Sequence, residues 1–482
     1  MDRKDINNER FWLGLCVLAG TVFCVLFVIN ARRGGLWTDE LFTVWATDPT
    51  ISPWQLQFDR LRYETNPPLH FWLLYGLRQI VPDARLAGLI LNFTVVAATV
   101  AAIVMTMRRD GRALLGYGLA ILFSLNSATL IYVQEVRAYV LAIGLSAVLA
   151  VLVMSFVREG RGWVAVLAVL GAVTALSHVY GALFAGGLAA ALVVEGLVSR
   201  RTEVWRAGLI IGVACSVPFL IWFMGVHHQE GGTLRNIGWI SFAPEHIKST
   251  IDGILRVFIG PVWVLIIWAM ALVTALRSPV FRRSGLMVAV VAVIFLIGPF
   301  VISAKVPILH YRYFAVGFPA LVLLLAFAVN EVWRNEPSRL RKGAAAIFVL
   351  IPVVMSLPVS WAELTMKPVW RGAEVVRVNA QACPSGVVRG LTYPDARVQP
   401  IFPFTYEYLL RSTGLKVTGS DQVADVSDIN CRLVAWVEHN GFISETTDEA
   451  LLLERLNLTN RQQVPLVIHH HRNGLVILKA GR

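Results

Sequence analysis

Long apolar runs bounded by charged residues recur along most of the chain. The first run, residues 11–30, carries no charged side chain and is long enough to cross a bilayer as a helix. No clear A-x-A-like cleavage site follows it, so we interpret it as a retained span rather than a signal peptide. The pattern predicts about eleven spans, near residues 11–30, 86–107, 113–131, 136–157, 162–179, 181–198, 206–226, 251–276, 284–303, 313–332 and 343–361.

Two stretches depart from this pattern. The apolar stretch between Pro68 and Asp83 is short for a span, so it predicts an interfacial or re-entrant helix inside a long first outer loop, residues 31–85. Its Pro-Pro start is typical of a helix N-terminus. From about Glu363 the chain becomes polar, with short β-like runs such as "CRLVAWVE" and "PLVIHHHRNGLVILKA". This pattern predicts a compact soluble α/β domain over residues 362–482.

Composition supports the membrane class. The 482 residues are 56% hydrophobic and 15% charged, whereas soluble domains average about 25% charged residues. We therefore expect an α-helical polytopic membrane protein with about 11–13 spans over residues 1–361, followed by the soluble domain. The net charge of +12 does not indicate nucleic-acid binding, because no basic stripe is interleaved with exposed aromatic residues.

The basic residues lie in short loops between the spans, which is the pattern that sets membrane orientation. Placing these loops in the cytoplasm puts the N-terminus inside and the C-terminal domain outside. The loops are Arg108–Arg112, Arg158–Arg161, Arg200–Arg206, Arg277–Arg283 and Arg334–Lys342.

The remaining polar groups then converge on the outer face. Ionisable residues at membrane depth are costly, so their default interpretation is functional. A carboxylate against apolar walls has a raised pKa and is a better general base, and a facing cationic cluster can hold a phosphate. This combination suits chemistry on a lipid-linked phosphate. The outer segments are Asp39-Glu40, Arg62–His70, Tyr132–Tyr139, "SHVYG" from Ser177, His227–Thr250 and Lys305–Tyr313.

Four of these segments carry motifs in a recognisable order. They are "LWTDELFT" from Leu36, "NPPLHFWLL" from Asn66, "QEVRAYVL" from Gln134 and "HYRYF" from His310, with a proline-containing span after the last. In this order and spacing the chain resembles the GT-C polyprenyl-phosphate-sugar glycosyltransferases, the protein mannosyltransferase-like and aminoarabinose transferase-like proteins of glycosyltransferase family 39/83 type. The resemblance covers the membrane region of about 360 residues and implies a GT-C fold in a bacterial inner membrane, with the C-terminal domain in the periplasm.

The resemblance implies transfer of a sugar from a polyprenyl phosphate to an extracytoplasmic acceptor by one inverting displacement. In the family the first-loop acid, here Asp39, is the proposed catalytic base. Glu40 matches the second acid of the pair, and Glu135 matches a second outer-loop acid. The expected donor-phosphate ligands are Lys305, Arg312, Arg137 and His310, and the expected substrate-lining residues are His178, Tyr139, Asn66 and His70. The acceptor could be lipid A or another glycolipid, a polysaccharide or a protein.

Structural interpretations stand beside these roles. Asp39 and Glu40 could be solvated loop acids, and Glu135 with Arg137 could be an ion pair at a span end. Asn66 could belong only to a helix start, His178 could be a satisfied interfacial histidine, and Arg312 could anchor the chain at the interface.

Cofactor use stays open. No cofactor is certain, and family members differ in whether they need a divalent metal, for which Glu40 is one candidate ligand. His227-His228 with Glu230 is a weak metal candidate. The tract His469–His471 lies in an apparent strand, where neighbouring side chains point to opposite faces. Cys383 and Cys431 could pair in an oxidising compartment.

Two other function classes match parts of this pattern. A polyprenyl-lipid or polysaccharide transporter or flippase also has many spans and buried charges, but it often shows internal repeats with charges near mid-span. This chain shows no repeat, and its charges gather at one face. A polysaccharide ligase or polymerase would use similar donors but matches the four motifs less well.

Overall fold

The computed structural model describes two compact units of the chain. Residues Met1–Arg33 and Pro49–Leu364 form one unit, and residues Gly34–Asp48 and Thr365–Arg482 form the other. Each is described by itself. The described residues are 3–33, 38–159, 163–227, 242–259, 279–306, 308–333, 358 and the five strands of the second unit.

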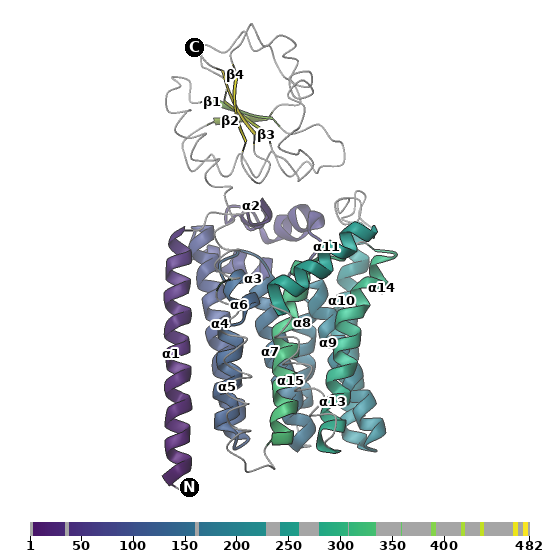
Figure 1. Ribbon diagram of the computed structural model, residues 1–482. Coiled ribbons are helices and arrows are strands. Elements are labelled where there is room, and N and C mark those ends of the chain that lie inside the picture. Colours follow the sequence, from purple (N-terminus) through teal and green to yellow (C-terminus); the bar gives the residue numbers. More distant parts are fainter. Residues whose placement is uncertain are drawn as a thin grey trace. The chain divides into compact units, whose positions relative to one another are not determined.

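The first unit is helical throughout its described part (Figure 1). Its α-helices are α1 Arg3–Arg33, α3 Leu69–Arg78, α4 Ala84–Arg109, α5 Ala113–Ser124, α6 Ser127–Tyr132, α7 Tyr139–Glu159, α8 Val164–Ala175, α9 Val179–Val198, α10 Thr202–His227, α11 Pro244–Ile254, α13 Pro279–Ala292, α14 Gly298–Ser303 and α15 Phe318–Trp333. Short π-helical turns are η1 Gln55–Arg60, η4 Leu255–Ile259 and η5 Val293–Ile297, and 3-10 turns are η2 Leu61–Tyr63 and η6 Tyr311–Val316.

Among the described residues, six helical segments are long and apolar enough to cross a membrane: Glu9–Ile29, Ala84–Arg109, Tyr139–Glu159, Val179–Val198, Thr202–Gly225 and Gly285–Ser303. Three shorter apolar helices are Ala113–Ser124, Val164–Ala175 and Phe318–Phe327. The prediction of a polytopic helical membrane protein is confirmed. The predicted span 251–276 is described only as far as residue 259, and the predicted span 343–361 lies outside the described residues.

One predicted span is divided in the structure. Residues 113–131 form α5 and the short α6, because Asn126 is extended and its side chain accepts a hydrogen bond from the Ala128 backbone at 2.9 Å. This is the usual way that asparagine starts a helix. The α6 segment is tied to the far part of the sequence, since the Ser127 hydroxyl donates to the Val257 carbonyl at 2.6 Å.

Hydrogen bonds between distant loops define the two ends of the helical unit. At the basic end, the Arg158 guanidinium donates to the Asp110 carbonyl at 3.4 Å and that of Arg201 donates to the Val157 carbonyl. At the other end, here called the polar-loop end and made of residues 64–70, 132–139, 177–180 and 308–313, the Leu69 backbone donates to the Leu176 carbonyl at 3.2 Å. Figure 1 shows α3 and α6 at this end and the N-terminus at the opposite end. The described parts of three of the five basic loops, around Asp110, Arg158 and Arg201, therefore lie at one end of this unit.

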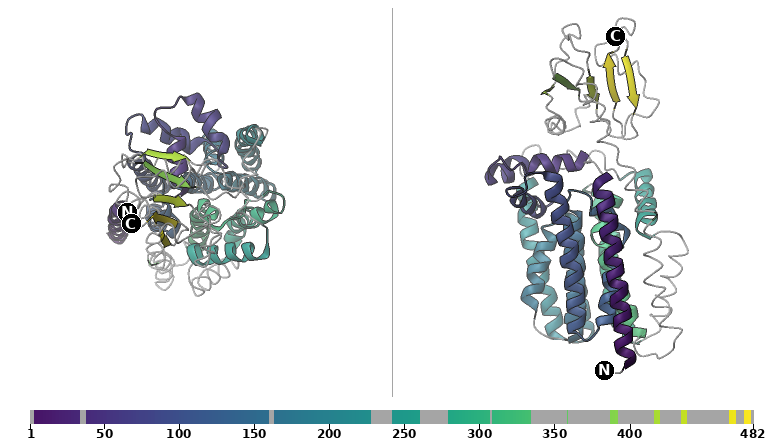
Figure 2. Two further views of the ribbon diagram at one scale, coloured as in Figure 1. Left: turned by 90° about the horizontal axis from the view of Figure 1, so that it is seen from above. Right: turned by 90° about the vertical axis from the view of Figure 1, so that its left-hand side faces the viewer.

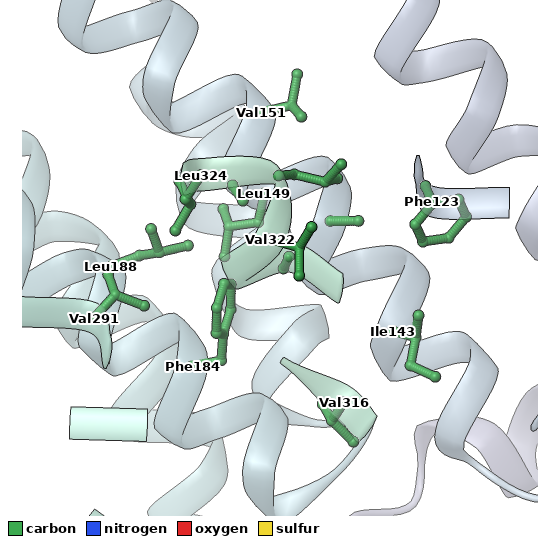
Figure 3. Packing of buried hydrophobic residues seen from close by; sticks show 14 of the residues in the cluster. Phe123, Ile143, Leu149, Val151, Phe184, Leu188, Val291, Val316, Val322 and Leu324 are labelled. Atoms are coloured by element: carbon green, nitrogen blue, oxygen red, sulfur yellow. The ribbon is translucent and has the colours of Figure 1, made fainter. Parts of the chain in front are cut away.

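Apolar side chains from non-neighbouring helices fill the centre of the unit. Figure 3 shows Leu149 of α7, Phe184 and Leu188 of α9, Val291 of α13 and Leu324 of α15 converging on one buried cluster. The first helix lies at the edge: α1, dark purple in Figures 1 and 2, runs beside α5 and leaves side chains such as Phe11 and Val17 exposed. Exposed apolar side chains on a span are those that would face lipid.

Helices α9 and α10 pack closely through glycine. Gly208 and Gly212 lie one turn apart on α10, the small-xxx-small spacing that lets two helices approach. A methyl group on Gly208 would lie 2.7 Å from the Ala189 carbonyl oxygen and 2.8 Å from the Val193 backbone nitrogen, both on α9. On Gly212 it would meet only the Ala189 side chain, at 3.7 Å.

We therefore expect Gly208→Ala to lower the free energy of unfolding by about 1–3 kcal/mol, because backbone atoms cannot move aside cheaply. The matched control is Gly212→Ala, which has room for the methyl group and gains helix propensity, so it should be neutral or slightly stabilising. Thermal unfolding of the purified variants in one detergent measures both. Equal losses for the two variants would contradict the expectation.

The second unit contains α2 Thr38–Ala46 and a five-stranded sheet in the order β2-β1-β3-β5-β4. The strands are β1 Val387–Leu391, β2 Lys416–Gly419, β3 Val434–Val437, β4 Leu466–His470 and β5 Val476–Ala480. β1 pairs in parallel with β2 and β3, while β5 pairs antiparallel with β3 and β4; the two yellow arrows in the right view of Figure 2 are β4 and β5.

The two β-like runs named from the sequence contain β3, β4 and β5. His469 and His470 lie in β4, as the strand interpretation of the histidine tract requires. The helices predicted for this domain, and Cys383 and Cys431, lie outside the described residues. The soluble, extracytoplasmic character of this unit stays a prediction.

Candidate active site

The Glu64 carboxylate accepts hydrogen bonds from a tight turn at the polar-loop end. It follows η2, and its Oε1 atom accepts hydrogen bonds from the backbone of Thr65 at 3.0 Å and of Asn66 at 3.0 Å, the Asn66 amide at 2.8 Å and the Thr65 hydroxyl at 3.3 Å. These bonds close a tight turn just before Pro67-Pro68 starts α3. Its other oxygen, Oε2, pairs with the Arg137 guanidinium at 3.1 Å. Glu64 thus links the first loop to the segment before α7.

Arg137 lies in a segment that α4 also holds. The Asn92 amide donates to the Val133 carbonyl at 3.1 Å and to the Glu135 carbonyl at 2.6 Å. Residues 133–137 are therefore fixed by side-chain bonds to α4 on one side and to the Glu64 turn on the other. The Glu64 and Arg137 side chains are only 4% and 10% exposed, so their charges compensate each other away from water.

Two histidines lie near Arg137, one at each of two helix starts. His178 caps α9: its Nδ1 accepts a hydrogen bond from the Tyr180 backbone at 3.1 Å. His70 lies in the first turn of α3 and is fully buried. Burial, aided by the positive charge of Arg137, lowers the pKa of both imidazoles to about 3, so both are neutral at pH 7. Neither His70 ring nitrogen has a hydrogen-bond partner among the described residues, nor does the Nε2 of His178.

These pKa values predict a pH dependence of stability. A histidine that is neutral when folded and has its ordinary pKa of about 6.5 when unfolded contributes fully above pH 6.5, and the contribution is lost as the pH falls towards 3. Each histidine should contribute a slope of about 1.4 kcal/mol per pH unit in that window. Unfolding temperatures measured in detergent from pH 7.5 to pH 5 should fall less for His70→Gln than for the wild type. Identical slopes would contradict this reading of His70.

Aromatic rings pack against one another at the polar-loop end. His178 contacts the rings of Tyr139 and Tyr313, each with centroids 5.4 Å apart, and the Tyr180 hydroxyl donates to the Ile308 carbonyl at 2.9 Å. These contacts join α7 and α9 to the loop before η6. Apolar ring surface of this kind limits water locally, and charges in such surroundings attract one another more strongly than in water.

Arg312 lies in η6, next in sequence to Tyr313 of this aromatic group. Arg312 is half-buried in η6; burial alone would lower its pKa, but nearby Tyr311 and Glu135 raise the pKa well above its usual value. The carboxylate of Glu135 therefore lies within electrostatic reach of Arg312. The neighbouring His310 ring is 5.6 Å from that of Tyr313 and 6.4 Å from that of His246, whose Nε2 lies 2.7 Å from the Leu309 carbonyl oxygen.

The structure brings most of the predicted residues of the first unit together. The polar-loop end contains Asn66, His70, Glu135, Arg137, Tyr139, His178, His310 and Arg312. Lys305 is exposed in the turn after α14, and the side-chain contacts described for this end do not include it. Arg137 pairs with Glu64, a residue that the sequence interpretation paired with nothing.

The first-loop acids belong to the other unit. Asp39 and Glu40 lie in the first turn of α2, where Glu40 is buried; the side chain of Asp39 is outside the described part of the structure. Their assignment to an active site stays a prediction. In the described ranges of both units, no group of three histidine, cysteine, aspartate or glutamate side chains could hold a metal ion. Residues 228–230 lie outside those ranges.

Glu64, Tyr132, Tyr311 and Tyr313 also lie among the predicted residues at the polar-loop end, although the sequence interpretation gave them no role. Glu64 lies inside the quoted stretch Arg62–His70, two positions before the Asn-Pro-Pro motif, and that position was the available signal. The tyrosines flank the predicted charges in "YVQEVRAY" and "HYRYF" but were interpreted as motif context. Their shared role became visible only when α7, α9 and η6 were placed together.

Taken together, these features define a polytopic helical membrane protein with a buried polar cluster at one end of its spans. No family model and no curated protein matches the sequence. Solved structures do match its fold. ArnT from Cupriavidus metallidurans bound to undecaprenyl phosphate superimposes with a TM-score of 0.58 at 16% identity, covering 97% of this chain and 99% of that one. The same protein in the apo state gives a TM-score of 0.58 at 17% identity, with 98% and 99% covered. The chain therefore has the fold of ArnT over nearly its whole length, and the GT-C fold expected from the four motifs is confirmed.

Proposed function

We propose that this protein is a membrane glycosyltransferase that moves a sugar from a polyprenyl phosphate to an acceptor at the polar-loop end. The observation that carries the proposal is a pair of arginines at one end of an ArnT fold. Arg137 is buried beside Glu64, and Arg312 is half-buried near Glu135. An ArnT structure with this fold is bound to undecaprenyl phosphate. Guanidinium groups in a site of low water content are well suited to a lipid phosphate that arrives from the bilayer.

The proposed reaction is a single displacement at the anomeric carbon. The acceptor hydroxyl oxygen forms a bond to C1 while the bond from C1 to the phosphate oxygen breaks, and configuration at C1 inverts. The hydroxyl proton passes to the carboxylate of Asp39, and polyprenyl phosphate leaves with the bonding electrons. Glu40 orients that base, contacts the acceptor or helps to hold a metal, and Glu135 positions Arg312.

The phosphate is held by cations of the polar-loop end. Arg312 and Arg137 stabilise the charge that develops on the departing phosphate; the ion pair of Arg137 with Glu64 and the charge of Glu135 near Arg312 support these roles. His310 and the exposed Lys305 are secondary ligands of the donor phosphate. Neutral His70 and His178, with Asn66 and Tyr139, line the substrate and donate or accept hydrogen bonds without adding charge.

The proposed setting is a bacterial inner membrane, with the basic loops in the cytoplasm and the polar-loop end facing the periplasm. The acceptor is a glycolipid such as lipid A, a polysaccharide or a protein, and the C-terminal domain helps to recognise it. Divalent metal dependence is decided by assay in the presence and absence of a chelator.

The test is transfer of label from a panel of polyprenyl-phosphate sugars, including mannose, aminoarabinose, galacturonic acid and arabinofuranose, by the purified protein in proteoliposomes. We expect one donor to be consumed, with release of polyprenyl phosphate in equal amount to glycosylated acceptor. A protein that moves the labelled lipid between leaflets without cleaving the sugar would instead be the flippase of the alternative interpretation.

A further inference from the structure

Glu64 belongs to none of the four sequence motifs, yet both oxygens of its carboxylate accept hydrogen bonds at the polar-loop end. One oxygen takes all four donors from Thr65 and Asn66, and the other faces Arg137. A carboxylate that accepts several hydrogen bonds from a turn is held in one position. Glu64 is thus a fixed negative charge rather than a side chain free to move away.

This fixed charge lies against a cation with an expected part in catalysis. The pair joins residues 73 positions apart, so it exists because the fold brings the first loop to the segment before α7. Arg137 in turn acts on its other neighbours: its positive charge contributes to keeping His70 and His178 neutral. A ligand that binds beside Arg137 therefore contacts a guanidinium whose positive charge is already partly balanced by the carboxylate of Glu64.

We propose that Glu64 is a positioning residue that acts through Arg137: it holds the guanidinium in place and, as a built-in counter-anion, weakens the grip of Arg137 on the lipid phosphate. The inference rests on the proposed function, because it requires that Arg137 face the phosphate of the donor and of the product. An enzyme of this kind must release polyprenyl phosphate after each turnover, and a permanently paired arginine binds that product less tightly than an unpaired one.

The sign of the expected effect distinguishes this role from a structural one. Glu64→Gln keeps an oxygen that can accept the hydrogen bonds of the turn but removes the negative charge beside Arg137. Undecaprenyl phosphate should then bind about five- to tenfold more tightly. Turnover should fall about tenfold, because the guanidinium is less well placed and the product leaves more slowly. Loss of structure alone would weaken binding and turnover together.

The experiment measures the dissociation constant of undecaprenyl phosphate and the turnover of sugar transfer for the full chain in nanodiscs. Glu64→Gln is compared with the wild type and in an Arg137→Gln background, where removal of the Glu64 charge should change binding less than about twofold. Glu203→Gln is the matched control, because Glu203 forms an exposed pair with Arg201, 3.0 Å long, at the basic end of the same unit. It should leave both constants unchanged.

Glu64→Asp is the second variant, since Glu64→Gln leaves a buried arginine without its counter-ion and this destabilises the fold. The shorter acid keeps its charge but draws back from Arg137, so binding should tighten about twofold to threefold. Weaker or unchanged binding in both Glu64 variants, or the same tightening when Arg137 is absent, overturns the inference. A wild-type protein that neither binds undecaprenyl phosphate nor transfers any sugar overturns the proposed function instead, and the inference with it.

Discussion

Asp39→Asn is expected to reduce the turnover of sugar transfer by about three orders of magnitude while leaving the binding of undecaprenyl phosphate unchanged. Asparagine has nearly the shape of aspartate but cannot accept the proton of the attacking hydroxyl, and positioned general bases contribute about 10²- to 10⁴-fold. The measurement is single-turnover transfer from the donor identified in the panel, with the variant's unfolding temperature as a check on its structure. This would be the largest effect of any single isosteric change in the chain.

Asp48→Asn is the matched control, because Asp48 ends the same segment of the second unit as Asp39 and the resemblance gives it no role. It should stay within about twofold of the wild type. The turnover of Glu40→Gln should lie between those of Asp39→Asn and Asp48→Asn. Glu40 is buried and next to the base in sequence, so the loss of its charge alters the orientation of its neighbours. Undiminished transfer by Asp39→Asn would remove this residue as the base and leave the acids of the polar-loop end as the candidates.

Much of the helical unit follows from hydropathy alone. The predicted spans near 86–107, 136–157 and 181–198 correspond to α4, α7 and α9 within a few residues, because an apolar run that ends in basic residues has few alternatives to a span. The short apolar stretch after Pro68 is a ten-residue helix, α3, as its length indicated. The division of residues 113–131 was missed, although the Asn126-Ser127 dipeptide is a helix-start signal.

The candidate site was predictable in its residue types but not in its pairings. The sequence placed Glu135 and Arg137 two positions apart, which suggested that they pair. In the structure Arg137 pairs with Glu64, and the charge of Glu135 also acts on Arg312; residues 133–137 follow no regular helix and are held by Asn92. Partners separated by 73 positions depend on tertiary packing, and no local pattern in one sequence encodes them.

Lys305 and Arg312, which have the same expected role in the sequence, differ in their surroundings in the structure. Lys305 and Arg312 lie seven positions apart and were both expected at the donor phosphate. The structure leaves Lys305 exposed, whereas Arg312 is half-buried beside Glu135 and the tyrosines of the polar-loop end. An exposed ammonium group is hydrated and screened by salt, while a guanidinium with fixed neighbours presents its donors in one orientation. The two residues should therefore differ greatly in their contribution to transfer.

Arg312→Met is expected to lower kcat/KM for the donor by about 10²- to 10³-fold, the loss of roughly 3–4 kcal/mol that removal of a well-placed charged donor produces. Arg312→Lys keeps the charge but not the planar fork, so it should recover only about a tenth of the activity. Lys305→Met should cost less than about threefold, and that loss should vanish at high salt. The exposed Lys248 of α11 supplies a control, Lys248→Met, that should match the wild type.

The double variant Glu135→Gln/Arg312→Met shows why kcat/KM falls in Arg312→Met: either Arg312 binds the donor phosphate, or it only compensates the charge of Glu135. Removal of Arg312 alone takes away a positive charge that acts on Glu135, and this change in charge by itself disturbs the segment before α7. If Arg312 acts on the donor phosphate, neutralising Glu135 as well should restore the unfolding temperature but not kcat/KM. If activity returns together with stability, Arg312 is only the counter-ion of Glu135, and the donor phosphate must be held by Arg137, His310 and Lys305.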